Sequence, residues 1–533
     1  METKGSKFYI LLFSIVLPLI YLLPVITSPL SSDDLHNFEL RVSAKENKNQ
    51  SIPELANGAI CYYRECGRYT PFAEYSKEFA FKYFPGLLAY KLYLYFLNLL
   101  AVAAFAFLLY SIGQRKLIPF FMVMYGTVVQ FRLQFHDPFT SLHGMYLWLA
   151  VFMFLSAAFY GLFMQKRNYF LLLLSLLFSG LSFLTSEVGL VLLPVLFICS
   201  FFTKASKKYI SLTAVPFILC SMAYVLYVLH LRSSVTQIYE GVQTNLNPSA
   251  MLDVLAKQLF SALPLSNLYG LVSIPAIIAA QLKSIQNIVA VLFIFLLSAG
   301  IIAWQIKNRK EGGFKLSFAL ISLAFALAIL PACLIMQSVK YQQTMHYGFG
   351  YLPVFIQNFG TATLLACLAA FIVSHIRNKI FPAILVLAVC VASASSFLFN
   401  KAISKTRAYD QSLPLQAQWA SVEKGILSRC ESGSTIILIH DYIYKAPFIY
   451  HDIFMNLTGK DFKVYDIEDW VPEQADSINS NCYVFDCEKG DTIYTRLYSA
   501  DCYSANRLNI LHTDTFQHNV RLTEVEMPLL VRH

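Results

Sequence analysis

Long apolar runs separated by short polar gaps dominate the first 400 residues of the chain. A helix needs roughly 17 to 25 apolar residues to span a bilayer. The pattern therefore predicts about eleven transmembrane helices, near residues 8–29, 87–112, 117–133, 144–164, 169–186, 188–203, 209–231, 286–306, 314–336, 350–373 and 380–399. Leu265–Gln281 is also apolar, but a twelfth span there would invert every later loop. We interpret it as an interfacial or re-entrant segment.

Every second gap between these runs is short and basic, and the positive-inside rule places such gaps in the cytoplasm. The basic residues are Lys4, Lys7, Arg115, Lys116, Lys166, Arg167, Lys204, Lys207, Lys208, Lys307, Arg309, Lys310, Lys315, Arg377 and Lys379. The N-terminus is thus expected inside and the C-terminus outside. The first run is longer than the core of a typical signal peptide, so we interpret it as an uncleaved anchor.

The other gaps fall on the outer side, and some of them are long. Residues 1–399 are predicted to form the transmembrane domain, with extended outer loops at 30–86 and 232–285. The tail, 400–533, contains short β-like runs at Thr435–Ile439, Phe462–Ile467 and Cys482–Phe485. We therefore expect a small extracytoplasmic C-terminal α/β domain.

Composition agrees with a membrane protein and excludes a soluble one. Hydrophobic residues make up 57% of the chain and charged residues only 14%, whereas soluble domains carry about 25% charged residues. The net charge of +9 comes from basic residues beside apolar runs, while the tail is acidic on balance. This distribution indicates membrane topology and argues against a nucleic-acid partner.

An acidic pair follows the first apolar run directly. Asp33 and Asp34 would lie at the outer membrane surface, where a carboxylate can meet both a lipid headgroup and a soluble substrate. A carboxylate there could accept a proton from an attacking hydroxyl or hold a divalent metal ion. The alternative is a simple helix cap, a role that Ser and Asp favour.

Cations of the outer loops are candidates for binding a phosphate. Arg68 follows Gly67 in the first loop, Arg132 ends the third apolar run, and Lys340 lies between the ninth and tenth. A guanidinium matches phosphate oxygens in a fork, and an ammonium supplies a point charge. A lone arginine in an outer loop can equally contact solvent or lipid headgroups.

Four more ionisable residues are expected at the same face and could support the site or contact an acceptor. His136 and Asp137 lie in the second outer loop, and His346 lies near Lys340. Glu187 occupies a tight turn between two apolar runs, where an ionisable group is costly without a function.

These features together resemble the GT-C superfamily of polytopic glycosyltransferases, which use polyprenyl-phosphate-linked sugars. The matching features are the acidic pair opening a long first outer loop, surface helices in that loop, Gly67-Arg68, His136-Asp137 and the outer C-terminal domain. The resemblance implies transfer of a sugar from a polyprenyl-phosphate carrier to a glycan, lipid or protein acceptor. It also implies that Asp33 or Asp34 is the catalytic base, and that Asp137 assists with a metal or the acceptor.

Two other classes remain open on the sequence. An O-antigen ligase or polymerase is also polytopic, but it usually places its large soluble segment in an internal loop. A transporter or non-catalytic scaffold is the other alternative, although transporters tend to carry charged or broken helices at mid-membrane. The predicted partners are membrane lipids, the lipid-linked sugar and its acceptor. The expected location is the bacterial inner membrane.

Overall fold

The computed structural model describes most of the chain. The described residues are 4–30, 34, 37, 51–132, 136–203, 206–235, 238–270, 274–307, 316–376, 380–408, 412–439, 447–466, 482–489, 493–501 and 509–518.

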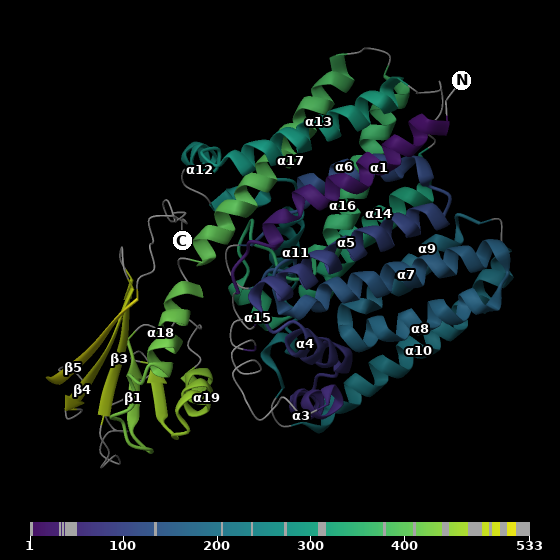
Figure 1. The fold of residues 1–533 in the computed structure, drawn as a ribbon. Helices are drawn as coiled ribbons and strands as arrows, with labels where there is room; N and C mark the ends of the chain where they lie inside the picture. The colour runs from purple at the N-terminus through teal and green to yellow at the C-terminus, as the bar shows by residue number, and fades with distance from the viewer. Residues whose placement is uncertain are drawn as a thin grey trace.

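Seven of the described helices are long and apolar enough to cross a membrane. They are α5 (Leu87–Ser111), α7 (Met145–Lys166), α10 (Lys207–Ser234), α13 (Ile285–Lys307), α14 (Phe318–Ile335), α16 (Val354–His375) and α17 (Ile380–Arg407). Their axes run in broadly the same direction through one bundle (Figure 1). The prediction of a polytopic helical membrane protein is confirmed.

Four shorter elements occupy the remaining predicted spans. They are α1 (Lys4–Tyr21) continued by η1 (Leu23–Val25), α6 (Ile118–Val128) preceded by η3 (Arg115–Leu117), α8 (Tyr169–Thr185), and α9 (Leu192–Ser200) preceded by η5 (Glu187–Val191). The helix α6 packs against α16 and α17 inside the bundle. The count of eleven spans stays a prediction. Within the segment interpreted as re-entrant, α12 (Ile274–Gln281) is a short helix that contacts α17.

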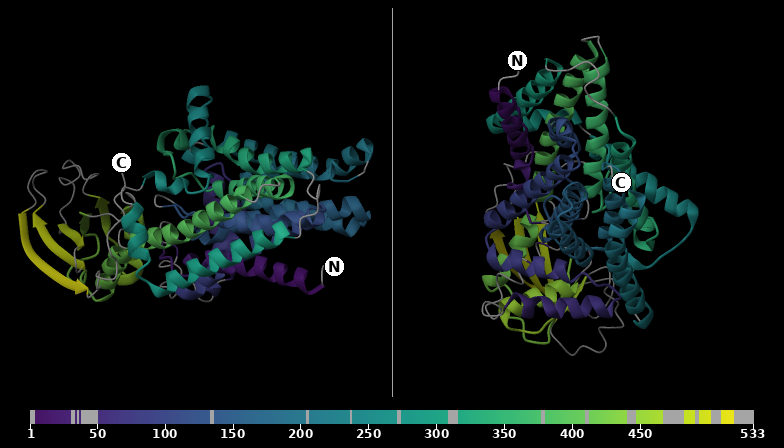
Figure 2. Two further views of the ribbon diagram at one scale, coloured as in Figure 1. Left: turned by 90° about the horizontal axis from the view of Figure 1, so that it is seen from above. Right: turned by 90° about the vertical axis from the view of Figure 1, so that its right-hand side faces the viewer.

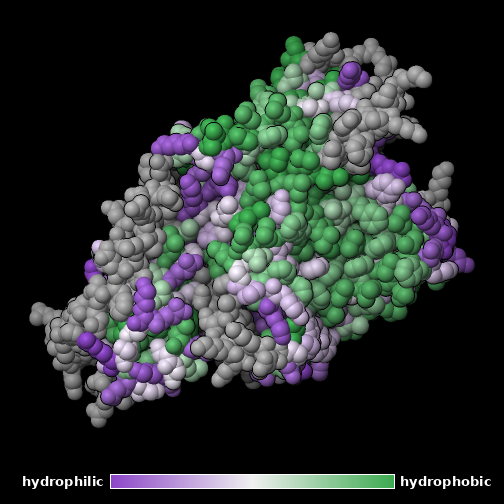
Figure 3. All heavy atoms as spheres, viewed as in Figure 1, coloured by the Kyte–Doolittle hydropathy of each residue, from purple (hydrophilic) through white to green (hydrophobic). Residues whose placement is uncertain are grey.

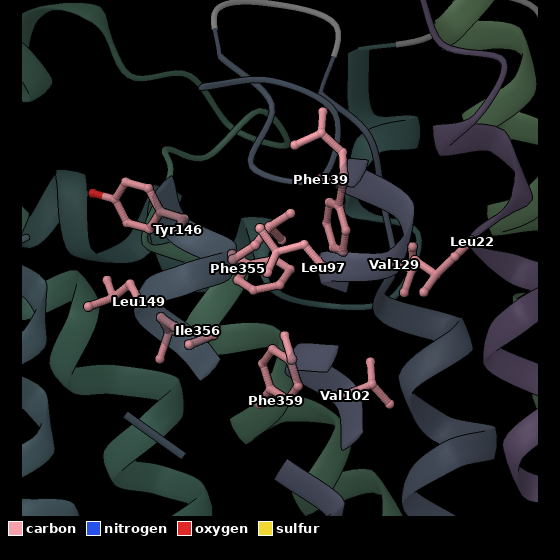
Figure 4. Close-up of a cluster of buried hydrophobic side chains, with 14 of the residues drawn as sticks. Leu22, Leu97, Val102, Val129, Phe139, Tyr146, Leu149, Phe355, Ile356 and Phe359 are labelled. Carbon is pink, nitrogen blue, oxygen red and sulfur yellow. The ribbon is translucent and has the colours of Figure 1, made fainter. Parts of the chain in front are cut away.

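Aromatic packing forms the centre of the bundle. Phe359 on α16 lies 5.2 Å from Phe105 and 4.7 Å from Phe154, measured between ring centroids, so it joins α5, α7 and α16. Figure 4 shows Phe359 together with Leu97 and Phe355 in this apolar cluster. Gly360 lets α14 approach closely, because a Cβ there would lie 2.4 Å from the amide nitrogen of Ala328. Small residues commonly permit such contacts between membrane helices, where close packing drives association.

The outside of the bundle is apolar, which is the reverse of a soluble protein. Large hydrophobic side chains stand exposed on α8, α10 and α13, among them Phe170, Leu219 and Leu296. Figure 3 shows hydrophobic residues covering the bundle, while hydrophilic residues lie at its two ends and over the part that carries the sheet. Lipid tails can cover this surface without any loss of hydrogen bonds. The chain is an integral membrane protein.

Shorter helices gather at one end of the bundle, near the sheet (Figure 1). They are α3 (Ile52–Glu65), α4 (Pro71–Tyr83), η4 (Leu142–Gly144), η6 (Glu240–Val242), α11 (Pro248–Ser261), η7 (Ser266–Gly270) and α15 (Val339–Thr344). The start of α1 lies at the opposite end (Figures 1 and 2). Which end faces outward stays a prediction, and we call the sheet-bearing end the outer end.

The last part of the chain holds a mixed sheet with the strand order β2-β1-β3-β4-β5. The three neighbours β2, β1 and β3 are parallel, with Thr435 paired to Lys463 and to Cys482, whereas β3, β4 and β5 are antiparallel. The elements are α18 (Leu413–Glu423), β1 (Thr435–Leu438), α19 (Pro447–Thr458), β2 (Lys463–Asp466), β3 (Cys482–Lys489), β4 (Ile493–Asp501) and β5 (Asn509–His518). The strands β1, β2 and β3 begin at or beside the predicted β-like runs. A separate extracytoplasmic domain stays a prediction.

Candidate functional site

A tight turn between α3 and α4 presents Arg68 at the outer end. Gly67 has a φ of +76°, which favours glycine, and a Cβ there would lie 3.2 Å from Cγ of Arg232. The backbone N–H of Tyr239 donates to the carbonyl of Cys66 at 3.0 Å. Nε of Arg232 donates to the carbonyl of Gly67 at 3.3 Å. The last turn of α10 and the chain that follows it therefore hold the Arg68 turn in place.

Two predicted cations share one aromatic ring. The guanidinium carbon of Arg68 lies 5.5 Å from the ring centroid of Tyr239, and Nζ of Lys340 lies 5.6 Å from the same centroid. Arg68 also lies 5.8 Å from the ring of Tyr63. Cation–π attraction holds charges at such distances without neutralising them. The first outer loop and α15 thus bring their cations to the same place.

A carboxylate lies near Arg68 and contacts Arg232. Glu187 begins η5, directly after Ser186, whose side chain caps the turn by accepting from the N–H of Val188 at 3.3 Å. Its Oε1 lies 2.5 Å from Nη2 of Arg232 in a half-buried ion pair. Burial opposes the charge on Arg68, but Tyr239 and Glu187 outweigh it and hold the pKa of Arg68 above its ordinary value. The guanidinium therefore stays charged.

A cavity of about 160 Å³ opens between these groups. Its walls combine Arg68 and Glu187 with four tyrosines and two serines, and apolar residues complete it. The lining residues are Arg68, Tyr146, Ser186, Glu187, Val188, Leu190, Tyr239, Gly241, Val242, Leu334, Ile335, Ser338, Tyr341, Tyr351 and Leu352. Figure 4 shows the hydroxyl of Tyr146 pointing away from the apolar cluster of the bundle.

Two tyrosines of the cavity, Tyr341 and Tyr351, act as neutral groups. Burial raises the pKa of both phenols above the ordinary value; Tyr351 adds to the rise at Tyr341, whereas the hydrogen bond with Tyr341 opposes the rise at Tyr351. Their phenols therefore stay protonated at physiological pH and can both donate and accept hydrogen bonds. Rings and hydroxyls in this arrangement suit a polyhydroxylated ligand.

Asp34 lies in a separate buried network. Its side chain is fully buried; Oδ2 accepts from the phenol of Tyr90 at 2.6 Å, and Oδ1 accepts from the N–H of His143 at 3.0 Å. Lys91, the next residue of α5, donates to the carbonyl of Thr140 at 2.7 Å. Asp34 does not line the cavity. It ties the chain after α1 to α5 and η4, and Asp33 lies outside the described residues.

Arg132 and Asp137 organise the loop that follows α6. The guanidinium of Arg132 donates to the carbonyls of Gly348 at 2.8 Å and Ser261 at 2.7 Å. Asp137 accepts from the backbone N–H of Arg132 at 2.5 Å and from that of Phe139 at 2.8 Å. Both side chains are buried, and neither lines the cavity. In this structure the pair joins three chain segments.

The two histidines also lie apart from the cavity. His136 is half-buried beside Asp137, and His346 is exposed after α15. Across the part of the chain that the structure describes, no group of three or more His, Cys, Asp or Glu residues could hold a metal ion. The structure thus brings together Arg68, Glu187 and Lys340 and leaves Asp34, Arg132, His136, Asp137 and His346 outside that group.

Sequence reasoning missed Arg232 and Tyr239. Both residues follow an apolar run, and no motif around them distinguishes them from ordinary loop residues. A signal existed for Arg232, because it lies at the outer end of a predicted span, where the positive-inside rule makes arginine less common. The four tyrosines carry no such signal, since tyrosine is enriched at every membrane interface.

No protein-family model matches the chain, and no curated protein is similar to it. Among the solved structures that match, two are similar over most of their length. A crystal structure of ArnT from Cupriavidus metallidurans bound to undecaprenyl phosphate is 11% identical, with 90% of this chain and 93% of that chain covered and a TM-score of 0.44. The apo state of ArnT gives 10% identity, the same coverage and a TM-score of 0.43. Both likenesses concern the fold alone.

Proposed function

We propose that the protein is a membrane glycosyltransferase that moves a sugar from a polyprenyl-phosphate carrier to a glycan, lipid or protein acceptor. One observation carries this proposal. Arg68 lines a cavity together with Glu187 and Tyr239 at the outer end of an apolar bundle, and Lys340 lies against the same Tyr239 ring. A lipid-linked phosphate needs cations at the membrane surface, and Arg68 and Lys340 are two cations beside one ring at the outer end.

The leaving phosphate is the group that these cations would bind. Arg68 can hold two phosphate oxygens in a fork, while Lys340 adds a mobile point charge. When the bond between the sugar and the phosphate breaks, negative charge grows on the phosphate. Fixed cations placed beforehand stabilise that charge more than the starting ester, which lowers the barrier.

The transferred sugar would lie against the tyrosines. Tyr146, Tyr341 and Tyr351 offer ring faces and neutral hydroxyls, and the serine hydroxyls of the cavity add further partners. Apolar sugar faces pack on aromatic rings, and sugar hydroxyls need hydrogen bonds once they leave water. Such a wall would also hold the anomeric carbon in line for attack.

The acidic pair divides into two roles. The carboxylate of Asp34 accepts hydrogen bonds from Tyr90 and His143 at full burial, which suits an anchor. Asp33 is then the candidate base that takes the proton from the acceptor hydroxyl. We assign Arg132 and Asp137 to shaping the second outer loop, where His136 also lies, and leave His346 as a candidate contact for the acceptor.

A transfer assay tests the function. The purified protein in lipid nanodiscs is incubated with polyprenyl-phosphate sugars that carry a labelled sugar, together with outer-face glycans and lipids as acceptors. We expect label to move to an acceptor and the polyprenyl phosphate to be released in equal amount. Asp33→Asn should abolish both products without changing thermal stability. Release that is unaffected by Asp33→Asn and by Arg68→Gln would contradict the proposed site.

A further inference from the structure

We propose that Arg232 is a positioning residue for the lipid phosphate. Its side chain bridges Glu187 and the Gly67 carbonyl and so fixes where Arg68 stands in the cavity. The inference rests on the proposed function, because it assigns Arg232 a role at the same phosphate-binding cation. Arg232 itself does not line the cavity and would act through its two contacts.

The guanidinium of Arg232 contacts its two partners through two different edges. Nε donates to the carbonyl of Gly67 at 3.3 Å, and Nη2 contacts Oε1 of Glu187 at 2.5 Å. The planar fork lets one side chain hold two partners at fixed angles, which an ammonium cannot do. The stem packs so close to Gly67 that a Cβ at that residue would lie 3.2 Å from Cγ of Arg232.

The turn that carries Arg68 needs contacts from outside its own helix to hold it in position. It follows α3, a surface helix in which Ala56 is the buried residue. Packing of α3 therefore contributes little to the placement of Arg68. Two donors from a distant part of the chain contact the turn: the Tyr239 N–H on the Cys66 carbonyl and Arg232 on the next carbonyl. Arg232 belongs to the last turn of α10, and Tyr239 lies in the chain that follows it.

Charge gives the bridge a second function. Arg68, Arg232 and Lys340 would repel one another in a half-buried place, and Glu187 is the acid of the cavity wall. Through its ion pair, Arg232 holds the Glu187 carboxylate, which in turn attracts the Arg68 guanidinium. An arginine that merely contacted lipid headgroups would point both edges of its guanidinium into solvent rather than onto protein oxygens.

Binding of undecaprenyl phosphate to the protein in nanodiscs tests the inference, with the uncharged alcohol undecaprenol as the reference lipid. We compare wild type, Arg68→Gln, Arg232→Gln and the double variant. Arg115→Gln is the matched control, because Arg115 is exposed and stacks on Tyr110 away from the cavity. Arg68→Gln and Arg232→Gln should each bind undecaprenyl phosphate roughly 10-fold more weakly or worse than wild type. The double variant should bind no more weakly than Arg68→Gln, since Arg232 acts only through Arg68.

A conservative variant separates geometry from charge. Arg232→Lys keeps the positive charge but cannot span both partners, so it should lose about as much affinity as Arg232→Gln. If Arg232→Gln fails to fold, Glu187→Gln replaces it in the cycle, and the same coupling to Arg68 is expected. Losses that simply multiply in the double variant, or wild-type affinity in Arg232→Lys, would overturn the inference. Equal binding of both lipids by the wild type would instead refute the proposed function.

Discussion

The phenol of Tyr90 donates a 2.6 Å hydrogen bond to Oδ2 of a fully buried Asp34. The other carboxylate oxygen accepts the backbone N–H of His143, so one side chain connects the chain after α1, the start of α5 and η4. A carboxylate held by fixed donors is well suited to define the geometry of the outer end. It is poorly suited to move a proton between substrates, because each donor favours its charged form.

Stability and activity should therefore separate at the acidic pair. Tyr90→Phe removes the donor to a buried carboxylate and should lower the free energy of unfolding by about 1 to 3 kcal/mol. Asp34→Asn should also destabilise the protein, because its amide oxygen can replace only one of the two acceptor oxygens and its amide nitrogen would face the other donor. Thermal unfolding in nanodiscs measures both.

Asp33→Asn should behave in the opposite way. Loss of a general base typically lowers the rate by about 10² to 10⁴, and we expect unchanged thermal unfolding. The assignment of the base would be wrong if Asp33→Asn destabilised the protein but retained the wild-type rate per folded molecule.

Arg68→Lys tests whether the phosphate is held by geometry as well as by charge. The ammonium keeps the charge but loses the fork and the stacking on Tyr239. We expect the transfer efficiency to fall roughly 10-fold, which corresponds to about 1.4 kcal/mol. Arg64→Lys on the exposed face of α3 is the matched control and should leave the efficiency unchanged. Equal results for the two variants would remove Arg68 from the site.

The tyrosines of the cavity should act independently of pH. Because burial raises the pKa of Tyr351 above its ordinary value near 10, the phenol stays protonated at pH 6 and at pH 9. Tyr351→Phe should then lower transfer by roughly 2- to 10-fold, the value of one hydrogen bond, and by the same factor at both pH values. A loss seen at only one of them would mean that the phenol titrates during the reaction.

The helices could be predicted from the sequence because membrane burial leaves a long, uninterrupted signal. The apolar runs at 87–112 and 286–306 match α5 and α13 within two residues at each end. The strands β1 and β2 were likewise visible as short runs. These features depend on local composition. A membrane span in particular needs a continuous run of apolar residues, so it is visible in the sequence.

The site was only partly predictable, because its geometry depends on distant pairings. In the sequence, Arg132 and Arg68 are both arginines of outer loops and cannot be told apart. In the structure, Arg132 donates to carbonyls 216 and 129 residues away, whereas Arg68 lines the cavity. The burial of Asp34 depends on Tyr90, which lies 56 residues later. Glu187 was found because an ionisable residue in an apolar hairpin is costly without a function. Lys340 was found because a cation in an outer loop can bind a phosphate.

Topology can be tested without any functional assumption. A reporter fused after His533 should be extracytoplasmic, and one inserted within residues 307–315 should be cytoplasmic, because the positive-inside rule places that basic loop inside. The start of α1 and the sheet lie at opposite ends of the molecule, which agrees with this arrangement (Figure 2). Both reporters on the same side would show that the eleven-span interpretation is wrong.

The most direct test of the account is whether the cavity selects a lipid-linked phosphate. Binding of undecaprenyl phosphate and of undecaprenol is measured in nanodiscs for wild type and for Arg68→Gln, with Arg64→Gln as the control. The account predicts that wild type and Arg64→Gln prefer the phosphate by at least roughly 10-fold, or 1.4 kcal/mol, and that Arg68→Gln loses most of this preference. The same affinity for both lipids in the wild type, or a preference that survives Arg68→Gln, would contradict it.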